Sequence, residues 1–374
     1  MKVKIFVFSI LMMFTASVFG EIRLGALFAV TGPASFLGLP EKQTLEMLVE
    51  EINENGGINN EKIKLYLYDT RGDDSEARKK FMRLVQKDKV IAVIGPTRTG
   101  STLAIKDLAE KNGIPLFSCA ASRKIVEPVS KFVFKSPQSD DHAVEKIYEY
   151  IISKGKKRVA IITAQSGYGA TGRDALLSVA TKYNIEIVAD EKFRDTDKDM
   201  TAQLTKIAEK NPDAVICWGV GPAPAIVAKN FKQLNLKGML IMSHGVASKK
   251  FIELAGDAAD GIILPAGRLL IAEKLPDSDK FKSFLVDYKR KFEARYNSPV
   301  STFGGHAYDA FLMFKTAFEK AGKDNEKIAE AAENIKSLLG TAGEFNLSKE
   351  DHNGLTKNSF IMLTIKNGDW EPVN

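Results

Sequence analysis

The chain has 374 residues, of which 44% are hydrophobic and 27% are charged, values ordinary for globular proteins that exclude intrinsic disorder. This length suits two domains, each large enough to bury its own core. The formal net charge of +6 is mild, and the basic residues are scattered without interleaved aromatic residues, which argues against nucleic acid as a partner.

Residues 1–20 differ from the rest of the chain. Lys2 and Lys4 precede an apolar stretch over residues 5–14, and small residues follow up to Gly20. This order is typical of a secretory signal peptide that is cleaved after Gly20. The apolar stretch is too short to span a bilayer, and no later segment has an apolar run of sufficient length.

Cys119 and Cys217 are the only cysteines. Neither lies near the predicted cleavage site, so no residue is available for the lipid anchor of a bacterial lipoprotein. We therefore expect a free periplasmic protein. Each cysteine ends an apolar, strand-like run in a different half of the chain, which favours two buried free thiols, although the oxidising compartment would permit a disulfide.

From Glu21 onward, strand patterns alternate with helix patterns, which is typical of parallel sheets covered by helices in an α/β fold. The strand pattern occurs in two similar series, followed by a mainly helical region and by closing strands. The predicted strands are residues 22–30, 63–67, 90–94 and 114–117 in the first series, residues 159–163, 185–188, 214–217 and 239–242 in the second, then 261–265 and 360–365, with the helical region at 277–337.

Ligands in open α/β sheets bind beyond the carboxyl ends of strands, where loops present backbone N–H groups at helix N-termini. The third predicted strand runs into such a loop. Its Gly95 and Gly100 have the spacing of a phosphate-binding loop, but Ser101 stands where that loop needs a lysine. The hydroxyls of Thr97, Thr99 and Ser101, with the amides at the start of the helix, fit one carboxylate, and a helix cap without a ligand is the alternative.

Two further loops follow strands of the two series. Residues 118–122 are small or hydroxylic, with Ala120, Ala121 and Ser122 placed where a ligand can approach the backbone. In the second series, Tyr168 follows the first strand and is placed to cover the apolar body of a ligand from the opposing edge.

No motif indicates catalysis or metal binding. The four histidines, His142, His244, His306 and His352, are widely separated and lack metal-ligand spacing. No nucleophile elbow is present. His306 and Asp309, three residues apart on a predicted helix, fit a capping or packing role. We expect no enzyme activity, no cofactor and no metal.

Several short motifs occur along the chain in a characteristic order. Over nearly all of residues 21–370 they resemble the branched-chain amino acid binding proteins of bacterial ABC importers. The motifs are Thr31-Gly32-Pro33 with Gly38, Ile52-Asn53-Glu54-Asn55-Gly56-Gly57-Ile58, Ile94-Gly95-Pro96, Gly113-Ile114-Pro115, Gln165 to Gly169, and Ala307-Tyr308-Asp309-Ala310.

This resemblance implies the type I periplasmic-binding fold, in which two doubly wound parallel-sheet lobes are joined by a three-strand hinge and close on a ligand. We expect lobe 1 to comprise residues 21–140 and 267–345, and lobe 2 residues 141–266 and 346–374. The implied partners are a small-molecule ligand and a membrane permease with its ATPase. The expected state is a monomer.

The resemblance also implies which residues hold the ligand. Thr99, the backbone of Ala120 and Ser122 match positions that hold the carboxylate and amine of the ligand. Tyr168 matches the aromatic wall of the second lobe. Arg98 is available as a second contact for a carboxylate, with a solvated loop arginine as the alternative.

The chain departs from the family at two places. His244 stands where an acidic residue usually meets the ligand ammonium, and a neutral imidazole supplies no negative charge. Leu37 replaces an aromatic residue, and Trp218 and Val220 lie in a segment that is richer in tyrosine in the family, so the pocket is more apolar. The ligand hypotheses are a small hydrophobic amino acid or related carboxylate, or an amine-free aromatic or aliphatic carboxylate. A ligand-sensing module of the same fold is the alternative to a transport receptor.

Overall fold

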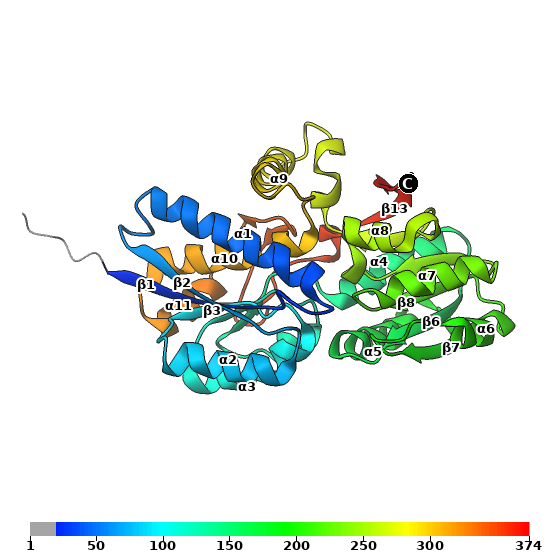
Figure 1. The fold of residues 1–374 in the computed structure, drawn as a ribbon, viewed down its shortest axis with the longest axis horizontal. Helices are drawn as coiled ribbons and strands as arrows, with labels where there is room; N and C mark the ends of the chain where they lie inside the picture. The colour runs from blue at the N-terminus through cyan, green and yellow to red at the C-terminus, as the bar shows by residue number, and fades with distance from the viewer. Residues whose placement is uncertain (1–19, 374) are drawn as a thin grey trace, which may run out of the picture.

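The structure is a computed structural model that describes residues 20–373, so the expected signal peptide lies outside the described residues apart from Gly20. Two α/β lobes lie end to end along the long axis of the molecule (Figure 1). The first lobe is built on a five-stranded sheet and the second on a seven-stranded sheet. The α/β fold with two parallel-sheet lobes is therefore confirmed.

The first sheet is parallel and has the strand order β2-β1-β3-β4-β5. Its strands are β1 (Glu21–Phe28), β2 (Lys62–Asp69), β3 (Ala92–Ile94), β4 (Leu116–Ser118) and β5 (Val133–Lys135).

Successive strand residues point to opposite sides of this sheet. Helices cover both of its faces because the residues on each face are apolar. In β1, Leu24 packs toward one face and Leu27 toward the other. The covering helices are α1 (Ser35–Glu54), α10 (Thr302–Ala321) and α11 (Asn325–Glu333) on one face, and α2 (Asp74–Gln86) and α3 (Thr99–Asn112) on the other.

The second sheet has the order β14-β13-β10-β9-β8-β6-β7, in which β13 runs antiparallel to both of its neighbours, β10 and β14, and the other pairs are parallel. The strands are β6 (Arg158–Ala164), β7 (Glu186–Phe193), β8 (Ala214–Trp218), β9 (Met239–Met242), β10 (Ile263–Ala266), β13 (Ile361–Lys366) and β14 (Asp369–Pro372). Its helices are α4 (Asp140–Ser153), α5 (Gly167–Ala180), α6 (Thr201–Glu209), α7 (Ala223–Gln233) and α8 (Lys249–Ala255).

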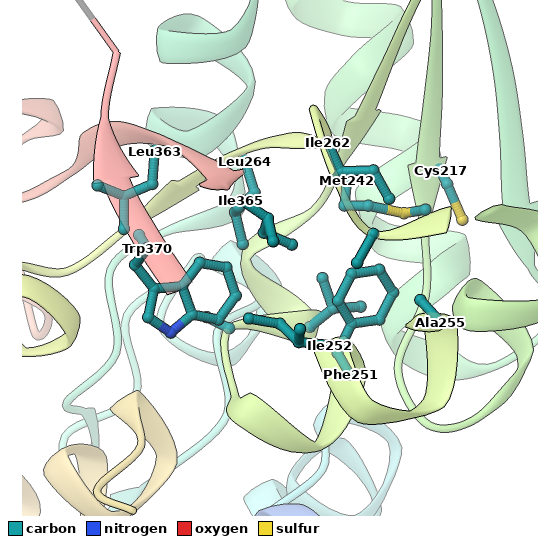
Figure 2. Packing of buried hydrophobic residues seen from close by; sticks show 14 of the residues in the cluster. Cys217, Met242, Phe251, Ile252, Ala255, Ile262, Leu264, Leu363, Ile365 and Trp370 are labelled. Carbon is teal, nitrogen blue, oxygen red and sulfur yellow. The ribbon is translucent and has the colours of Figure 1, made fainter. Parts of the chain in front are cut away.

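The C-terminal strands complete the core of the second lobe. Figure 2 shows Trp370 of β14 beside Ile365 of β13, with Ile252 and Phe251 of α8 approaching from below. All four side chains are buried. The strands β13 and β14 therefore stabilise the sheet of the second lobe.

The chain crosses between the two sheets three times. It leaves the first sheet at Lys135 and enters the second lobe with α4, and it returns after β10 by way of a short helical segment, Arg268–Lys274, and α9 (Lys282–Tyr296). The third crossing lies between β12 (Glu344–Phe345), which pairs with β11 (Leu338–Leu339), and β13. Three crossings side by side restrict the relative movement of the lobes to a hinge.

The strand predictions are confirmed in order, with shifts in their ends. The strand expected at 90–94 begins only at Ala92, and the one expected at 185–188 extends to Phe193. The three-residue β5 was not predicted. Cys119 and Cys217 are buried free thiols in different lobes. None of the helices in residues 20–373 has the length and apolarity needed to cross a membrane.

Candidate functional site

A small cavity lies where the carboxyl ends of strands from both lobes meet. Its volume is about 40 Å³, enough for a few water molecules, and a larger ligand requires the lobes to lie further apart than they do here. We call it the interlobe cavity. Its lining residues are Leu37, Thr97, Arg98, Thr99, Cys119, Ala120, Ala121, Phe303 and His306 from the first lobe, and Tyr168, Val220, His244 and Gly245 from the second.

The lobes are closed on each other around this cavity. A Cβ atom at Gly167, which begins α5, would lie 3.0 Å from the backbone of Gly100 in α3. A Cβ atom at Gly245 would lie 2.8 Å from the ring of Tyr168 and from Val220. Glycine at 167 therefore lets α5 of the second lobe approach α3 of the first closely, and glycine at 245 leaves space for Tyr168 and Val220 within the second lobe.

Eight of the ten predicted ligand contacts line the interlobe cavity, whereas Ser122 and Trp218 do not. The hydroxyl of Ser122 accepts a hydrogen bond from the N–H of Lys124 at 3.3 Å and caps a short helical turn. Trp218 is fully buried behind the cavity wall, with its ring centroid 5.8 Å from that of Tyr168 and 5.7 Å from that of His244. Ser122 and Trp218 therefore lie outside the cavity wall, and Trp218 packs against the lining residues Tyr168 and His244.

The two threonines after β3 have different environments. Thr97 is fully engaged, since its hydroxyl accepts from the N–H of Ala29 at 3.0 Å and donates to Glu41. Burial raises the pKa of Glu41 well above its usual range, and the hydrogen bond from Thr97 opposes this. Thr99 is buried as the first residue of α3, and its hydroxyl has no partner in the part of the chain that the structure describes. Thr99 therefore places an unpartnered hydroxyl beside the backbone N–H groups at the N-terminus of α3.

The loop after β4 brings its backbone to the same edge. The N–H of Ala120 donates to the hydroxyl of Ser118 at 3.1 Å, so that amide is already engaged. The methyl groups of Ala120 and Ala121 are small enough for a ligand to approach the main chain. The loop can therefore contact a ligand through its small side chains and its main-chain carbonyl groups, but not through the Ala120 amide.

Arg98 forms an ion pair between the two lobes. Its Nη2 lies 2.9 Å from Oδ2 of Asp195, which follows β7 in the second lobe, and its Nη1 donates to the carbonyl of Gly72 at 3.2 Å. Arg98 is therefore not the free contact for a ligand carboxylate that the sequence predicts, and it is not a solvated loop arginine. The guanidinium lines the cavity while it is held by a protein carboxylate.

Two neutral imidazoles face the interlobe cavity. Both nitrogens of His244 and Nδ1 of His306 are buried without a hydrogen-bond partner among the described residues. Burial lowers the pKa of each histidine to about 3, and the nearby charge of Lys135 contributes to both shifts. Both rings are therefore uncharged near neutral pH.

Sequence reasoning missed two residues of α10, Phe303 and His306. His306 lines the cavity and its ring also packs against that of Phe303, with ring centroids 5.9 Å apart, so the expected packing role is not contradicted. Asp309 does not pair with His306 and instead accepts hydrogen bonds from the backbone of Thr341 at 2.6 Å and of Ala342 at 2.8 Å. No local pattern distinguishes such a histidine from one in the core, since only the closure of the two lobes brings it to the site.

A larger cavity, of about 410 Å³, lies on the first lobe between α1, α9 and α10. Its floor is apolar, and charged side chains such as Glu51 and Lys291 pair with each other at its rim. In residues 20–373, none of its lining side chains carries a buried polar atom without a partner. It therefore lacks the polar groups that mark the interlobe cavity as a binding site.

No group of histidine, cysteine, aspartate or glutamate residues within 20–373 is arranged to hold a metal ion. Two hinged α/β lobes that close over a small cavity define the type I class of periplasmic binding proteins. Residues 21–369 match the family model described as periplasmic binding protein, and the chain belongs to this family. The resemblance to the branched-chain amino acid binding proteins is confirmed.

Known proteins similar to this chain match it over most of its length. The Leu/Ile/Val-binding protein BraC3 of Rhizobium johnstonii is 27% identical over 352 residues, which cover 93% of this chain and 92% of the relative. An extracellular ligand-binding receptor from Rhodopseudomonas palustris HaA2 has a TM-score of 0.88 and 27% identity, covering 95% of this chain and 100% of the receptor. The branched-chain amino acid transporter substrate binding protein LivJ of Streptococcus pneumoniae, in complex with isoleucine, has a TM-score of 0.83 and 26% identity, covering 94% and 98%.

Proposed function

We propose that this protein is an extracytoplasmic solute-binding receptor of an ABC importer that closes around a small hydrophobic amino acid or related carboxylate. The observation that carries this proposal is the convergence of unpartnered polar atoms of Thr99, His244 and His306 on a cavity with otherwise apolar walls. A buried polar group without a partner costs about 1–3 kcal/mol, and a ligand that satisfies it recovers this free energy.

The names of similar proteins support this ligand class. BraC3 is named a Leu/Ile/Val-binding protein, and LivJ was solved with isoleucine. The apolar wall of the cavity, with Leu37, Val220 and Phe303, suits an aliphatic or aromatic side chain.

Each end of the site has a distinct role in this proposal. The hydroxyl of Thr99 and the first amides of α3 bind the ligand carboxylate, and the backbone of Ala120 and Ala121 borders it. Tyr168 covers the ligand from the second lobe. Burial and the charge of Asp140 raise the pKa of the Tyr168 hydroxyl well above its usual range, so it stays neutral and acts as a hydrogen-bonding group.

A second candidate is a receptor for an amine-free aromatic or aliphatic carboxylate. The observation that favours it is the neutral state of His244, whose pKa of about 3 leaves no charge on the ring near neutral pH. A ligand-sensing module of the same fold, which passes occupancy to a receptor instead of a permease, would use the same site.

We further propose that the protein works by movement of its two lobes. The lobes move as rigid bodies, residues 21–140 with 267–345 and residues 141–266 with 346–374, because the chain passes between the sheets near these boundaries. Closure hides the ligand and presents both lobes to a membrane permease and its ATPase. The receptor acts as a monomer in the periplasm after its signal peptide is removed, and it releases the ligand chemically unchanged.

A thermal-shift screen tests the proposal. Refolded, ligand-stripped protein comprising residues 21–374 is heated with hydrophobic amino acids, aromatic acids, short aliphatic acids and amides. A specific ligand raises the melting temperature by mass action, with about 2.7 kcal/mol of stabilisation at one hundred times its dissociation constant. We expect a shift with hydrophobic amino acids or their carboxylate analogues and none with amides. The absence of any shift across both acid classes, or recovery of a chemically altered ligand, would overturn the proposal.

A further inference from the structure

Asp140 lies directly behind the cavity wall, next to His244. It begins α4 at the first crossing between the lobes, and its Oδ1 lies 3.4 Å from Nε2 of His244. Asp140 is 1% exposed, and neither of its oxygens has a hydrogen-bond partner within the described chain. It is not one of the lining side chains, so it acts on a ligand through the side chains in front of it, of which His244 is the one in direct contact.

Three aromatic rings hold the imidazole of His244 in place. The ring centroids of Tyr168, Trp218 and Phe360 lie 5.8, 5.7 and 5.2 Å from that of His244. With Nε2 turned toward Asp140, the carboxylate favours the tautomer that carries its hydrogen on Nε2. The other nitrogen, Nδ1, then has a free lone pair and acts as a hydrogen-bond acceptor.

We infer that His244 and Asp140 together bind the ammonium group of the ligand, with Asp140 as a positioning residue that supplies the negative charge. This inference rests on the proposed function and narrows its ligand to α-amino acids. Nδ1 of His244 accepts a hydrogen bond from the ammonium, and the charge of Asp140 lies one imidazole ring behind it. A carboxylate at the same point would meet a lone pair and a second negative charge, so an amine-free acid leaves this end of the site unpaired.

The charges around the pair make binding dependent on pH. Burial raises the pKa of Asp140 above its usual range and lowers the pKa of Lys135, and each charge opposes the shift of the other, so the two groups titrate as a pair. His244 and His306 have pKa values of about 3 and do not titrate near neutral pH. The titratable and polar groups that face the pair are Lys135 from the crossing segment, Asp141 on α4, Tyr168 and Thr171 on α5, and His306 on α10.

The sign of the pH dependence follows from linkage. A bound cation favours ionised Asp140 and lowers its pKa, so binding releases protons wherever the free protein still holds a proton on this carboxyl group. The affinity for an amino acid therefore rises as the pH increases and levels off once Asp140 is ionised without ligand. An amine-free acid carries no cation and should show no such release.

Titration calorimetry of the wild-type protein tests the inference without any substitution. The probes are two matched pairs, leucine with 4-methylpentanoate and phenylalanine with 3-phenylpropanoate, in buffers of different ionisation enthalpy between about pH 5.5 and about pH 8. We expect one amino acid to bind at least about tenfold more tightly than its amine-free partner and to release protons at the acidic end. Equal affinities within both pairs, or binding without proton release, would overturn the inference and leave the proposed function standing. If no probe of either kind binds, the proposed function fails and the inference fails with it.

Asp140→Asn keeps the shape of the side chain and removes its charge. We expect the affinity for the amino acid to fall at least about tenfold and the proton release to disappear, while the amine-free acid changes by less than about twofold. The matched control is Glu145→Gln on the same helix, because Glu145 pairs with Lys182 at 2.6 Å and is not among the groups that face His244 and Asp140. This control should retain wild-type affinity and proton release.

A buried substitution can prevent folding, so His244→Gln serves as a second variant, and thermal unfolding reports whether each variant is folded. We expect His244→Gln to lose both the preference for the amine and the proton release, because the link between Asp140 and the ligand is cut. A folded variant of either kind that keeps the wild-type pH profile would contradict the inference.

Discussion

Thr99 shows how one residue of the loop after β3 differs from its neighbours. Its hydroxyl lies at the first turn of α3, where it is buried and has no hydrogen-bond partner among the described residues. The hydroxyl of Ser101, by contrast, donates to Asp74 at 2.9 Å. A hydrogen bond to a charged ligand group contributes about 1.5–3 kcal/mol. The ligand carboxylate should therefore depend on Thr99 and not on Ser101.

We expect Thr99→Ala to weaken ligand binding by at least about tenfold with little change in thermal stability, since the free protein loses no hydrogen bond. The measurement is calorimetric titration with the amino acid that the thermal-shift screen identifies. Ser101→Ala, in the same helical turn, is the control and should bind as the wild type does. Equal affinities of the two variants would remove Thr99 from the carboxylate site.

Residues at the site were predictable to different degrees. Thr99, Ala120 and Tyr168 follow strands directly, so strand order alone places them at one edge of a sheet. Asp140 and His306 carry no such signal, because one starts a helix at a crossing and the other lies on the second turn of α10. Their proximity to His244 depends on the relative position of two lobes, which local patterns do not encode.

At the scale of elements, the start of α3 and the segment after β7 are joined by the ion pair of Arg98 and Asp195. Both side chains are only partly exposed, with 22% and 29% of their surface accessible. A second pair, Lys124 with Asp174 at 2.6 Å, also bridges the lobes and is more exposed. Such pairs contribute about 1 kcal/mol or less to folding, and we expect separation of the lobes to break them because each joins residues of different lobes.

Asp195→Asn should therefore weaken ligand binding by up to about fivefold, because the closed state loses a contact that the open state lacks. Thermal stability without ligand should stay close to that of the wild type. The control is Asp190→Asn, whose partner Arg173 lies in the same lobe, with Arg173 Nε 2.8 Å from the carboxylate. The role of the pair in closure is contradicted if both variants bind the ligand with equal, wild-type affinity.

The elements themselves were largely predictable from periodicity. Long apolar strands such as β1 and β6 and their following helices carry clear patterns, and the two series of strands anticipated the two sheets. The strand β5 was missed because Val133–Lys135 is too short for an alternation to be recognised and ends in a buried lysine. The segment is recognised as a strand only from its pairing with the neighbouring β4.

At the scale of the whole molecule, the two sheets share no strand, and three crossings connect them. The contacts that close the interlobe cavity, the approach of Gly167 to Gly100 and the pair of Arg98 and Asp195, come from loops and helix ends. Leu37 and Phe303 of the first lobe belong to the same buried cluster as Tyr168 and Val220 of the second, so hinge motion that opens the cavity also separates these apolar side chains. Closure on one ligand molecule is the central property that this arrangement supports.

Small-angle X-ray scattering of the ligand-stripped protein tests this property most directly. The radius of gyration is measured with and without a saturating amount of the amino acid that raises the melting temperature. We expect it to decrease on binding at a stoichiometry of one ligand per chain, because the open lobes come together. A radius of gyration that stays unchanged while calorimetry records the heat of binding would contradict closure and with it the account of this site.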